Sequence, residues 1–201
     1  MSFVGMLMVI VSLSWHSEIL RHESLRLMEA TASELAHGHL TGVFPGSRFR
    51  ADFSILEPGD ILLCHNPHGG YGYWTHAVLY VGGGQAVDAY DFERGTELRR
   101  VEAYQKYAEV AVLRAKIPRE RREHVAHWAL AEVGKPYDPL SGLTDTRSQY
   151  CSKLIWQLYG KAGVELSPAQ TWILPDQLAR SAALAWVAKW SVSPSVGRDV
   201  W

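Results

Sequence analysis

Short apolar runs separated by glycine- and proline-containing turns dominate the middle of the chain. Residues 61–64 follow the turn sequence Pro58-Gly59-Asp60, and residues 74–81 are rich in aromatic and β-branched side chains. Both patterns are typical of strands, and Gly82-Gly83-Gly84 marks a hairpin turn between the second run and the next one. The pattern predicts strands over residues 61–64, 74–81, 85–90, 98–101, 110–114 and 186–190.

Helical periodicity appears on both sides of this region. Leu154, Ile155, Leu158 and Ala162 recur at the spacing of one helix face, and Gly163 follows as a helix stop. Similar spacing predicts helices over residues 17–37, 119–133, 151–162 and 175–184. We expect an α+β fold, in which a meandering antiparallel sheet packs against helices. The turn signals near residue 50 divide the chain into a mostly helical N-terminal extension, 1–50, and a main domain, 51–201, that holds the sheet.

Composition and charge narrow the possible partners. The chain has 201 residues, of which 47% are hydrophobic and 20% charged, and its formal net charge is −1. These values indicate a globular protein, and the lack of a basic excess argues against nucleic acid as a partner.

The N-terminus carries an apolar run over residues 3–13. It is shorter than the roughly 20 residues that a membrane-spanning helix needs, so membrane association is not expected. No Lys or Arg precedes it and a poor cleavage site follows, which disfavours a signal peptide. A buried or oligomer-contacting segment and a secretory one both stay open. A cytoplasmic location is favoured, with the cell envelope as the alternative.

The two cysteines occupy different settings. Cys151 falls at the start of the helix predicted over residues 151–162, where the helix dipole and the N–H groups of the first turn favour thiolate over thiol. The same N–H groups could stabilise an oxyanion. A small residue packed at a helix start is the alternative interpretation. Cys64 ends an apolar strand and is expected to be a core residue, although a Cys64–Cys151 disulfide stays open.

A thiol nucleophile needs a base, and His76 is the candidate because it lies within a strand. With a three-residue loop, Val81 pairs with Gln85, Val78 with Asp88 and His76 with Tyr90. His76 and Asp88 then share a face as diagonal neighbours, within side-chain reach, as the base and orienter of a triad would. A strand histidine that merely bonds a nearby carboxylate is the alternative. The histidines lack a spacing that indicates a metal site, and no cofactor is expected.

Three segments together resemble the permuted branch of the NlpC/P60 superfamily, papain-like cysteine hydrolases that include the YiiX/YycO-type proteins. They are Pro58-Gly-Asp-Ile-Leu-Leu63, Trp74-Thr-His-Ala-Val-Leu-Tyr-Val-Gly-Gly-Gly-Gln-Ala-Val-Asp-Ala89, and Gly134-Lys-Pro-Tyr-Asp138 followed by Tyr150-Cys-Ser-Lys-Leu-Ile-Trp-Gln-Leu-Tyr159. The resemblance covers roughly residues 55 to 165. It implies a permuted papain-like fold in which Cys151 is the nucleophile, His76 the base and Asp88 the third polar residue.

The same resemblance implies a reaction and its substrates. The expected reaction is cleavage of an amide or peptide bond through an acyl-enzyme, and the expected substrate is a peptide, a peptidoglycan fragment or an acyl lipid. Tyr150, His68 and Trp74 are the candidates for oxyanion or substrate contacts. Lys153 departs from the Glu or Gly that other members often have, and Asp88 from their Glu or His. A non-catalytic binding module on the same fold is the alternative.

Overall fold

A computed structural model describes residues 49–67, 72–168 and 171–191. Its centre is a six-stranded sheet in the order β4-β3-β2-β1-β5-β6, in which every neighbouring pair is antiparallel. This confirms the predicted antiparallel sheet. The helix predicted over 17–37, the apolar run 3–13 and His68 lie outside the described residues. The strands are β1 Ile61–His65, β2 His76–Gly82, β3 Gln85–Asp91, β4 Gly95–Arg100, β5 Glu109–Ala115 and β6 Leu184–Ser191.

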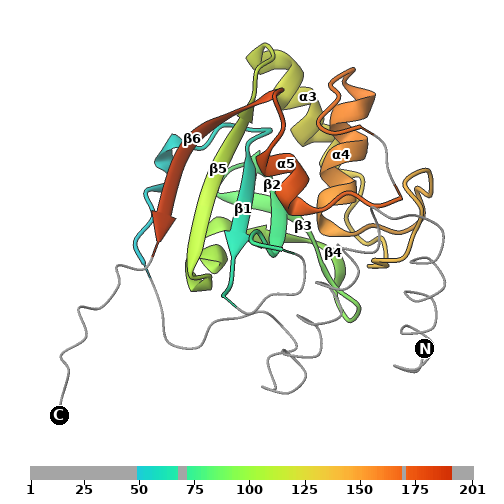
Figure 1. Cartoon of the computed structure of the whole chain (residues 1–201), viewed down its shortest axis with the longest axis horizontal. Helices are drawn as coiled ribbons and strands as arrows, with labels where there is room; N and C mark the ends of the chain where they lie inside the picture. Colours follow the sequence, from blue (N-terminus) through green and yellow to red (C-terminus); the bar gives the residue numbers. More distant parts are fainter. Residues whose placement is uncertain (1–48, 68–71, 169–170, 192–201) are drawn as a thin grey trace.

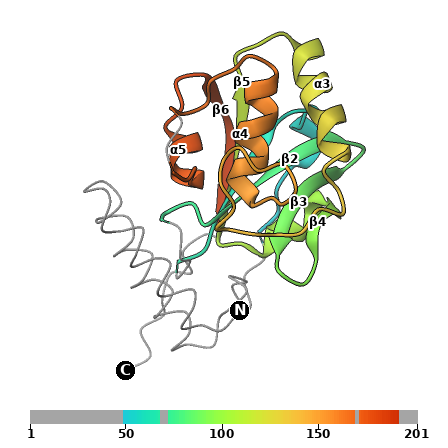
Figure 2. The same ribbon diagram turned by 90° about the vertical axis from the view of Figure 1, so that its right-hand side faces the viewer.

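Three helices cover one face of the sheet (Figure 1). They are α3 Arg119–Leu130, α4 Cys151–Lys161 and α5 Pro175–Ala179. Figure 2 shows α4 between α3 and α5, in front of the strands. The predicted stripe of α4 is buried there: Leu154, Ile155 and Leu158 pack with alternate residues of the central strands. Within the described residues, no helix combines the length and the hydropathy needed to cross a bilayer.

The opposite face of the sheet has its own apolar cluster. It is covered by the 3₁₀ helices η1, Phe53–Ile55, and η2, Val101–Lys106. Because side chains alternate along a strand, Leu62 and Cys64 face this cluster whereas Ile61 and Leu63 face the helices. Both faces of the central strands are therefore buried, which explains their continuous apolar runs.

Several predicted boundaries were wrong. The helix expected over 175–184 ends at Ala179, and Leu184 instead begins β6, where it pairs with Ala115. The alanine-rich stretch favours a helix locally, but pairing with the edge of β5 decides its conformation. Strand β2 begins at His76 and not at residue 74, α3 ends at Leu130, and Val101 begins η2.

The turn between β2 and β3 also differs from its prediction. Gly82 pairs with Gln85, so that only Gly83 and Gly84 form the loop, and both have positive φ angles, 61° and 72°. Such two-residue turns favour glycine. A register shift between Tyr80 and Gly82 restores the predicted register of the strand bodies, since Leu79 pairs with Val87 and Tyr80 with Ala86. A bulge thus compensates for the shorter loop.

Gly95, the first residue of β4, lies against Lys135 in the segment between α3 and α4. Its φ is +66°, and an added Cβ would lie 2.5 Å from the carbonyl oxygen of Lys135. Next to it, Thr96 N donates to Lys135 O at 2.8 Å and Gly134 N donates to Thr96 O at 2.8 Å. Close backbone contact at Gly95 therefore fixes the segment after α3 against the sheet.

We expect Gly95→Ala to lower the free energy of unfolding by about 1–3 kcal/mol, because it combines a left-handed backbone with a steric clash. Urea denaturation followed by circular dichroism measures the change. Gly142→Ala is the matched control, since its added Cβ meets no atom within 4 Å. Equal stability of the two variants would contradict the tight contact at Gly95.

Candidate active site

Cys151 is the first residue of α4, and its side chain is 5% exposed. Tyr150 precedes the helix in an extended conformation, and its side chain makes no capping hydrogen bond. The first intrahelical bond runs from Leu154 N to Tyr150 O at 3.0 Å. The Cys151 thiol therefore lies at the end of the helix where N–H groups precede the hydrogen-bonding ladder and where the dipole favours negative charge.

His76 and Asp88 are brought together by the β2–β3 hairpin. His76 Nε2 lies 2.7 Å from Asp88 Oδ1, and both side chains are buried. His76 is the first residue of β2, and Asp88 lies near the middle of β3. When the carboxylate accepts this bond from Nε2–H, Nδ1 is the nitrogen of the ring that can take a proton.

The Cys151 thiol and the His76 imidazole also interact. Burial by itself lowers the pKa of His76, but the charge of Asp88 and hydrogen bonds to Asp88 and Cys151 outweigh it, and the pKa is raised well above its ordinary value of 6.5. A raised pKa means that His76 binds a proton more readily than a free imidazole does, which suits a base beside a thiol. The start of α4 and the start of β2 thus meet in one Cys–His–Asp constellation.

Further residues hold this constellation, and the sequence analysis did not find them. The Tyr104 hydroxyl on η2 donates to Asp88 Oδ2 at 2.8 Å. The Tyr107 ring stacks on the His76 ring, with centroids 6.2 Å apart and an angle of 6° between the planes. Arg99 Nη1 lies 3.7 Å from Asp88 Oδ2. No sequence periodicity marks Tyr104, Tyr107 or Arg99. The one signal that could have suggested such partners is the requirement that a buried carboxylate accept several hydrogen bonds.

The residues on either side of Cys151 hold a second segment against the site. The Tyr150 hydroxyl accepts a hydrogen bond from Ile173 N at 3.1 Å, and Ser152 Oγ donates to Ile173 O at 2.6 Å. Both backbone groups of Ile173 are therefore used by neighbours of the nucleophile candidate. Tyr150 had been predicted as an oxyanion contact, and in the structure its hydroxyl binds the backbone of Ile173.

Trp74, the other described candidate for substrate contact, is 4% exposed and packs in the helix-side core. The backbone N–H of Trp74 donates to Asp176 Oδ1 at 2.7 Å, and the Trp74 ring lies 5.9 Å from that of Trp186, centroid to centroid. Tyr73 N donates to the other oxygen of Asp176 at 3.1 Å. Asp176 therefore anchors the start of the segment that leads into His76, and the buried Trp74 ring packs beneath it.

Cys64 lies beside the site but in a different environment. It pairs with His76 across β1 and β2 and is completely buried. Burial raises its pKa well above the ordinary value of 9.0, and the charges of Asp88 and Cys151 act in the same direction. Both cysteines are free thiols, so the Cys64–Cys151 disulfide left open above is absent from this structure. Cys64 has the properties of an inert core residue, as expected.

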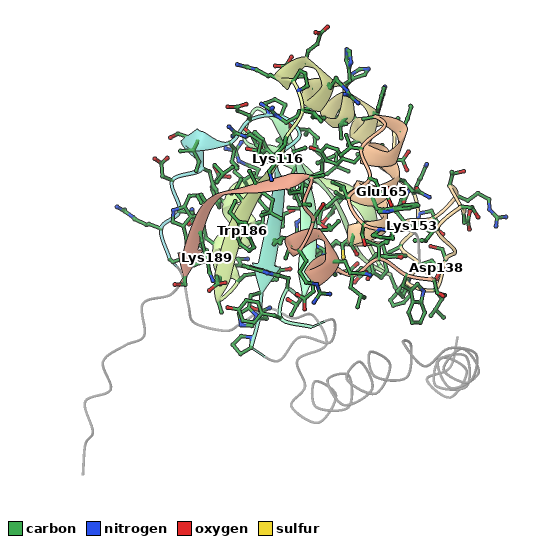
Figure 3. The ribbon with its side chains drawn as sticks, turned by 45° about the horizontal axis from the view of Figure 1, so that its top comes forward. Lys116, Asp138, Lys153, Glu165, Trp186 and Lys189 are labelled. Atoms are coloured by element: carbon green, nitrogen blue, oxygen red, sulfur yellow. The ribbon has the colours of Figure 1, made fainter. Side chains whose placement is uncertain are left out.

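Lys153 is fully buried one turn into α4. Its ammonium donates to Ser141 Oγ at 2.8 Å and to Ser148 O at 3.0 Å, and burial lowers its pKa. These bonds tie the loop before Cys151 to the helix. Figure 3 shows Lys153 and Asp138 on the side of the molecule away from β6, where Trp186 and Lys189 lie.

The site and the fold together define a papain-like class of protein, in which a cysteine at a helix start faces a histidine on a sheet. Residues 54–195 match the family model Peptidase_C92, described as a permuted papain-like amidase enzyme of the YaeF/YiiX type. The chain therefore belongs to this family. Its activity is accordingly that of an amidase-type hydrolase. The resemblance to NlpC/P60 proteins pointed to a related assignment, and Peptidase_C92 is the family that matches.

A solved structure with the same fold is that of the metalloprotein yiiX from Escherichia coli O157:H7. The two chains share 16% identity with a TM-score of 0.55, and the match covers 67% of this chain and 98% of the other. This likeness confirms the predicted α+β, permuted papain-like fold. No curated protein matches the sequence. In the part of this chain that the structure describes, no group of three or more His, Cys, Asp or Glu side chains could hold a metal ion.

Proposed function

We propose that the protein is a thiol amidase in which Cys151, His76 and Asp88 act as nucleophile, base and orienting acid. The proposal is supported chiefly by the 2.7 Å bond between His76 and Asp88, together with the position of Cys151 at the start of α4, where its thiol acts on the pKa of His76. The proposed base has a carboxylate to orient it, and the proposed nucleophile lies at a helix start. The order of residues in the chain does not matter, because a triad is defined by geometry.

The reaction proceeds in two halves. His76 Nδ1 takes the thiol proton, and Cys151 Sγ attacks the carbonyl carbon of the substrate. The resulting oxyanion accepts hydrogen bonds from N–H groups at the start of α4. When the tetrahedral intermediate collapses, the C–N bond breaks and His76 gives its proton to the leaving amine. Water, deprotonated by His76, then attacks the thioester and releases the acid and the free thiol.

The proposed substrate class is an amide within a peptide, with cell-wall peptides as one source. Family membership favours the amide over an ester. The alternative substrate on the same scaffold is an acyl lipid. No contact among the described residues specifically favours it.

Intact-mass spectrometry tests this proposal. Peptidoglycan fragments, simple N-acyl amino acids and acyl lipids are each incubated with the wild-type protein and quenched with acid. We expect an acyl adduct on Cys151 and release of amine from an amide substrate. Turnover of lipids alone would replace the amidase proposal by the acyl-lipid one, and the absence of any adduct or turnover would favour a non-catalytic module.

A further inference from the structure

A small pocket lies behind the His76–Asp88 pair. Its volume is about 260 Å³, and neither Cys151 nor His76 lines it. The lining comes from the β3–β4 turn, from β4 and from η2: Tyr90, Asp91, Glu93, Arg94, Arg99, Ala103, Tyr104, Lys106 and Tyr107. Because neither the proposed nucleophile nor its base lines the pocket, its ligand need not be the substrate.

The charged groups in the wall favour an anion. Arg94, Arg99 and Lys106 oppose Asp91 and Glu93. Asp91 Oδ1 already accepts hydrogen bonds from Glu93 N at 3.0 Å and Arg94 N at 2.7 Å, so this carboxylate is used by its own turn. The ion pair of Arg94 among the described residues is a long one, 4.0 Å from Glu97. The wall thus carries three cationic side chains and two acidic ones, and one of the two acids is engaged by its own turn.

Arg99 is the strongest sign of a missing ligand. Its Nη1 is buried and has no hydrogen-bond partner among the described residues. The nearest carboxylate oxygens, on Glu97 and Asp88, lie 3.5 Å from Nε and 3.7 Å from Nη1, beyond ordinary hydrogen-bond length. A buried donor without an acceptor is unfavourable, and an occupant of the pocket that accepts a hydrogen bond would remove this penalty.

The position of the guanidinium is fixed in advance. It lies over the Tyr90 ring at 3.9 Å from the centroid, and the Arg94 guanidinium lies over the same ring at 5.2 Å. Stacking on the Tyr90 ring holds the plane of Arg99 in place. A planar fork of N–H donors fits the oxygens of a carboxylate or a phosphate.

We propose that this pocket binds a small carboxylate- or phosphate-bearing molecule, with Arg99 as its main ligand and Arg94 and Lys106 as supporting cations. The pocket adjoins the catalytic constellation, and Cys151, His76 and Asp88 are not among its lining residues. Tyr104 bonds Asp88 and Tyr107 stacks on His76, so two walls of the pocket also support the triad. Because Cys151 does not line the pocket, binding does not depend on whether its thiol acts as a nucleophile.

The test is a titration of the ¹⁵N-labelled protein by NMR with inorganic phosphate and with malonate, against sodium chloride at equal ionic strength. We expect saturable shifts in the amides of residues 90–94 and 99–107 with at least one of the two anions. Arg99→Gln should weaken that binding by about tenfold or more. Arg100→Gln is the matched control, since Arg100 neighbours Arg99 but does not line the pocket, and it should change the affinity by less than about twofold.

Two further variants keep the test decisive. Lys106→Gln alters an exposed side chain, so this variant should fold and should bind the anion more weakly than the wild type. It can therefore be measured even if Arg99→Gln does not fold. Cys151→Ala should bind as the wild type does, which separates this site from the proposed hydrolase. Shifts that do not saturate, equal affinity in Arg99→Gln and Arg100→Gln, unchanged affinity in Lys106→Gln, or largest shifts around Cys151 would each overturn the proposal.

Discussion

Replacing Cys151 with alanine is expected to abolish both amide hydrolysis and rapid alkylation of the protein. The thiol is the group that forms the bond to the substrate, so its removal should lower kcat by about three orders of magnitude or more. The fold should persist, because alanine is a good helix former and Cys151 is a small residue at a helix start. The measurements are amine release and the rate of iodoacetamide labelling at mildly acidic pH.

Cys64→Ala is the matched control for this experiment. Cys64 is completely buried, and burial holds its pKa well above the ordinary range, so little thiolate exists there to be alkylated. Rapid labelling and activity should survive in this variant, with a thermal melt to check its folding. Labelling that is lost in Cys64→Ala and kept in Cys151→Ala would show that the nucleophile was assigned to the wrong cysteine.

Replacing Asp88 with asparagine is expected to have the second largest effect. The amide is nearly the same size but carries no charge, and it can no longer stabilise the His76 imidazolium. The comparable change in a serine triad lowers kcat by about 10⁴-fold, and we expect a loss of about 10²–10⁴-fold. The measurement is kcat on the substrate that the wild-type protein turns over.

The same variant has a signature in the titration of His76. Asp88 raises the pKa of His76 by its charge and by a hydrogen bond, so Asp88→Asn should move that pKa downward. NMR of the imidazole Cε1–H resonance follows the titration directly. Asp91→Asn is the matched control, since Asp91 lies on the same strand but caps its own turn. A His76 pKa that is equal in Asp88→Asn and the wild type would contradict the pairing.

The raised pKa of His76 also has a consequence for stability. A histidine whose pKa is higher in the folded than in the unfolded protein stabilises the fold fully below its unfolded pKa, about 6.5, and loses that effect as pH rises through the folded pKa. The difference in unfolding free energy between the wild type and Asp88→Asn should therefore be largest below about pH 6.5 and shrink above it. Urea denaturation over a pH series measures it. A difference that grows with pH would contradict this assignment.

Local sequence patterns were sufficient for much of the fold and for the pairs of groups that lie close along the chain. The apolar runs predicted all six described strands, and the glycine turn predicted which strand residues face each other. His76 and Asp88 are only twelve residues apart, so one hairpin register was enough to place them side by side. The position of Cys151 at a helix start was predictable for the same reason, since a helix start is visible in its own neighbouring residues.

The remaining features depend on contacts between distant parts of the chain. The bulge before Gly82 and the end of α5 at Ala179 are set by pairing with neighbouring strands and not by local preference. Tyr104 and Tyr107 reach the site because η2 packs on the face opposite the helices. These residues have no periodicity that marks them, and their roles arise only where Asp88 and His76 need partners.

The sequence by itself determined the antiparallel sheet, the hairpin that joins a histidine to an acid, and a cysteine at the start of a helix. Only the tertiary structure decided that this helix start meets the start of β2, which of the two cysteines is fully enclosed, and that Arg99 has a buried donor facing a pocket. The physical reason is the distance along the chain over which each interaction acts. Strand alternation, turn chemistry and helix ends act over a few residues, whereas the convergence of α4, β2, β3 and η2 is fixed by burial of both faces of one sheet.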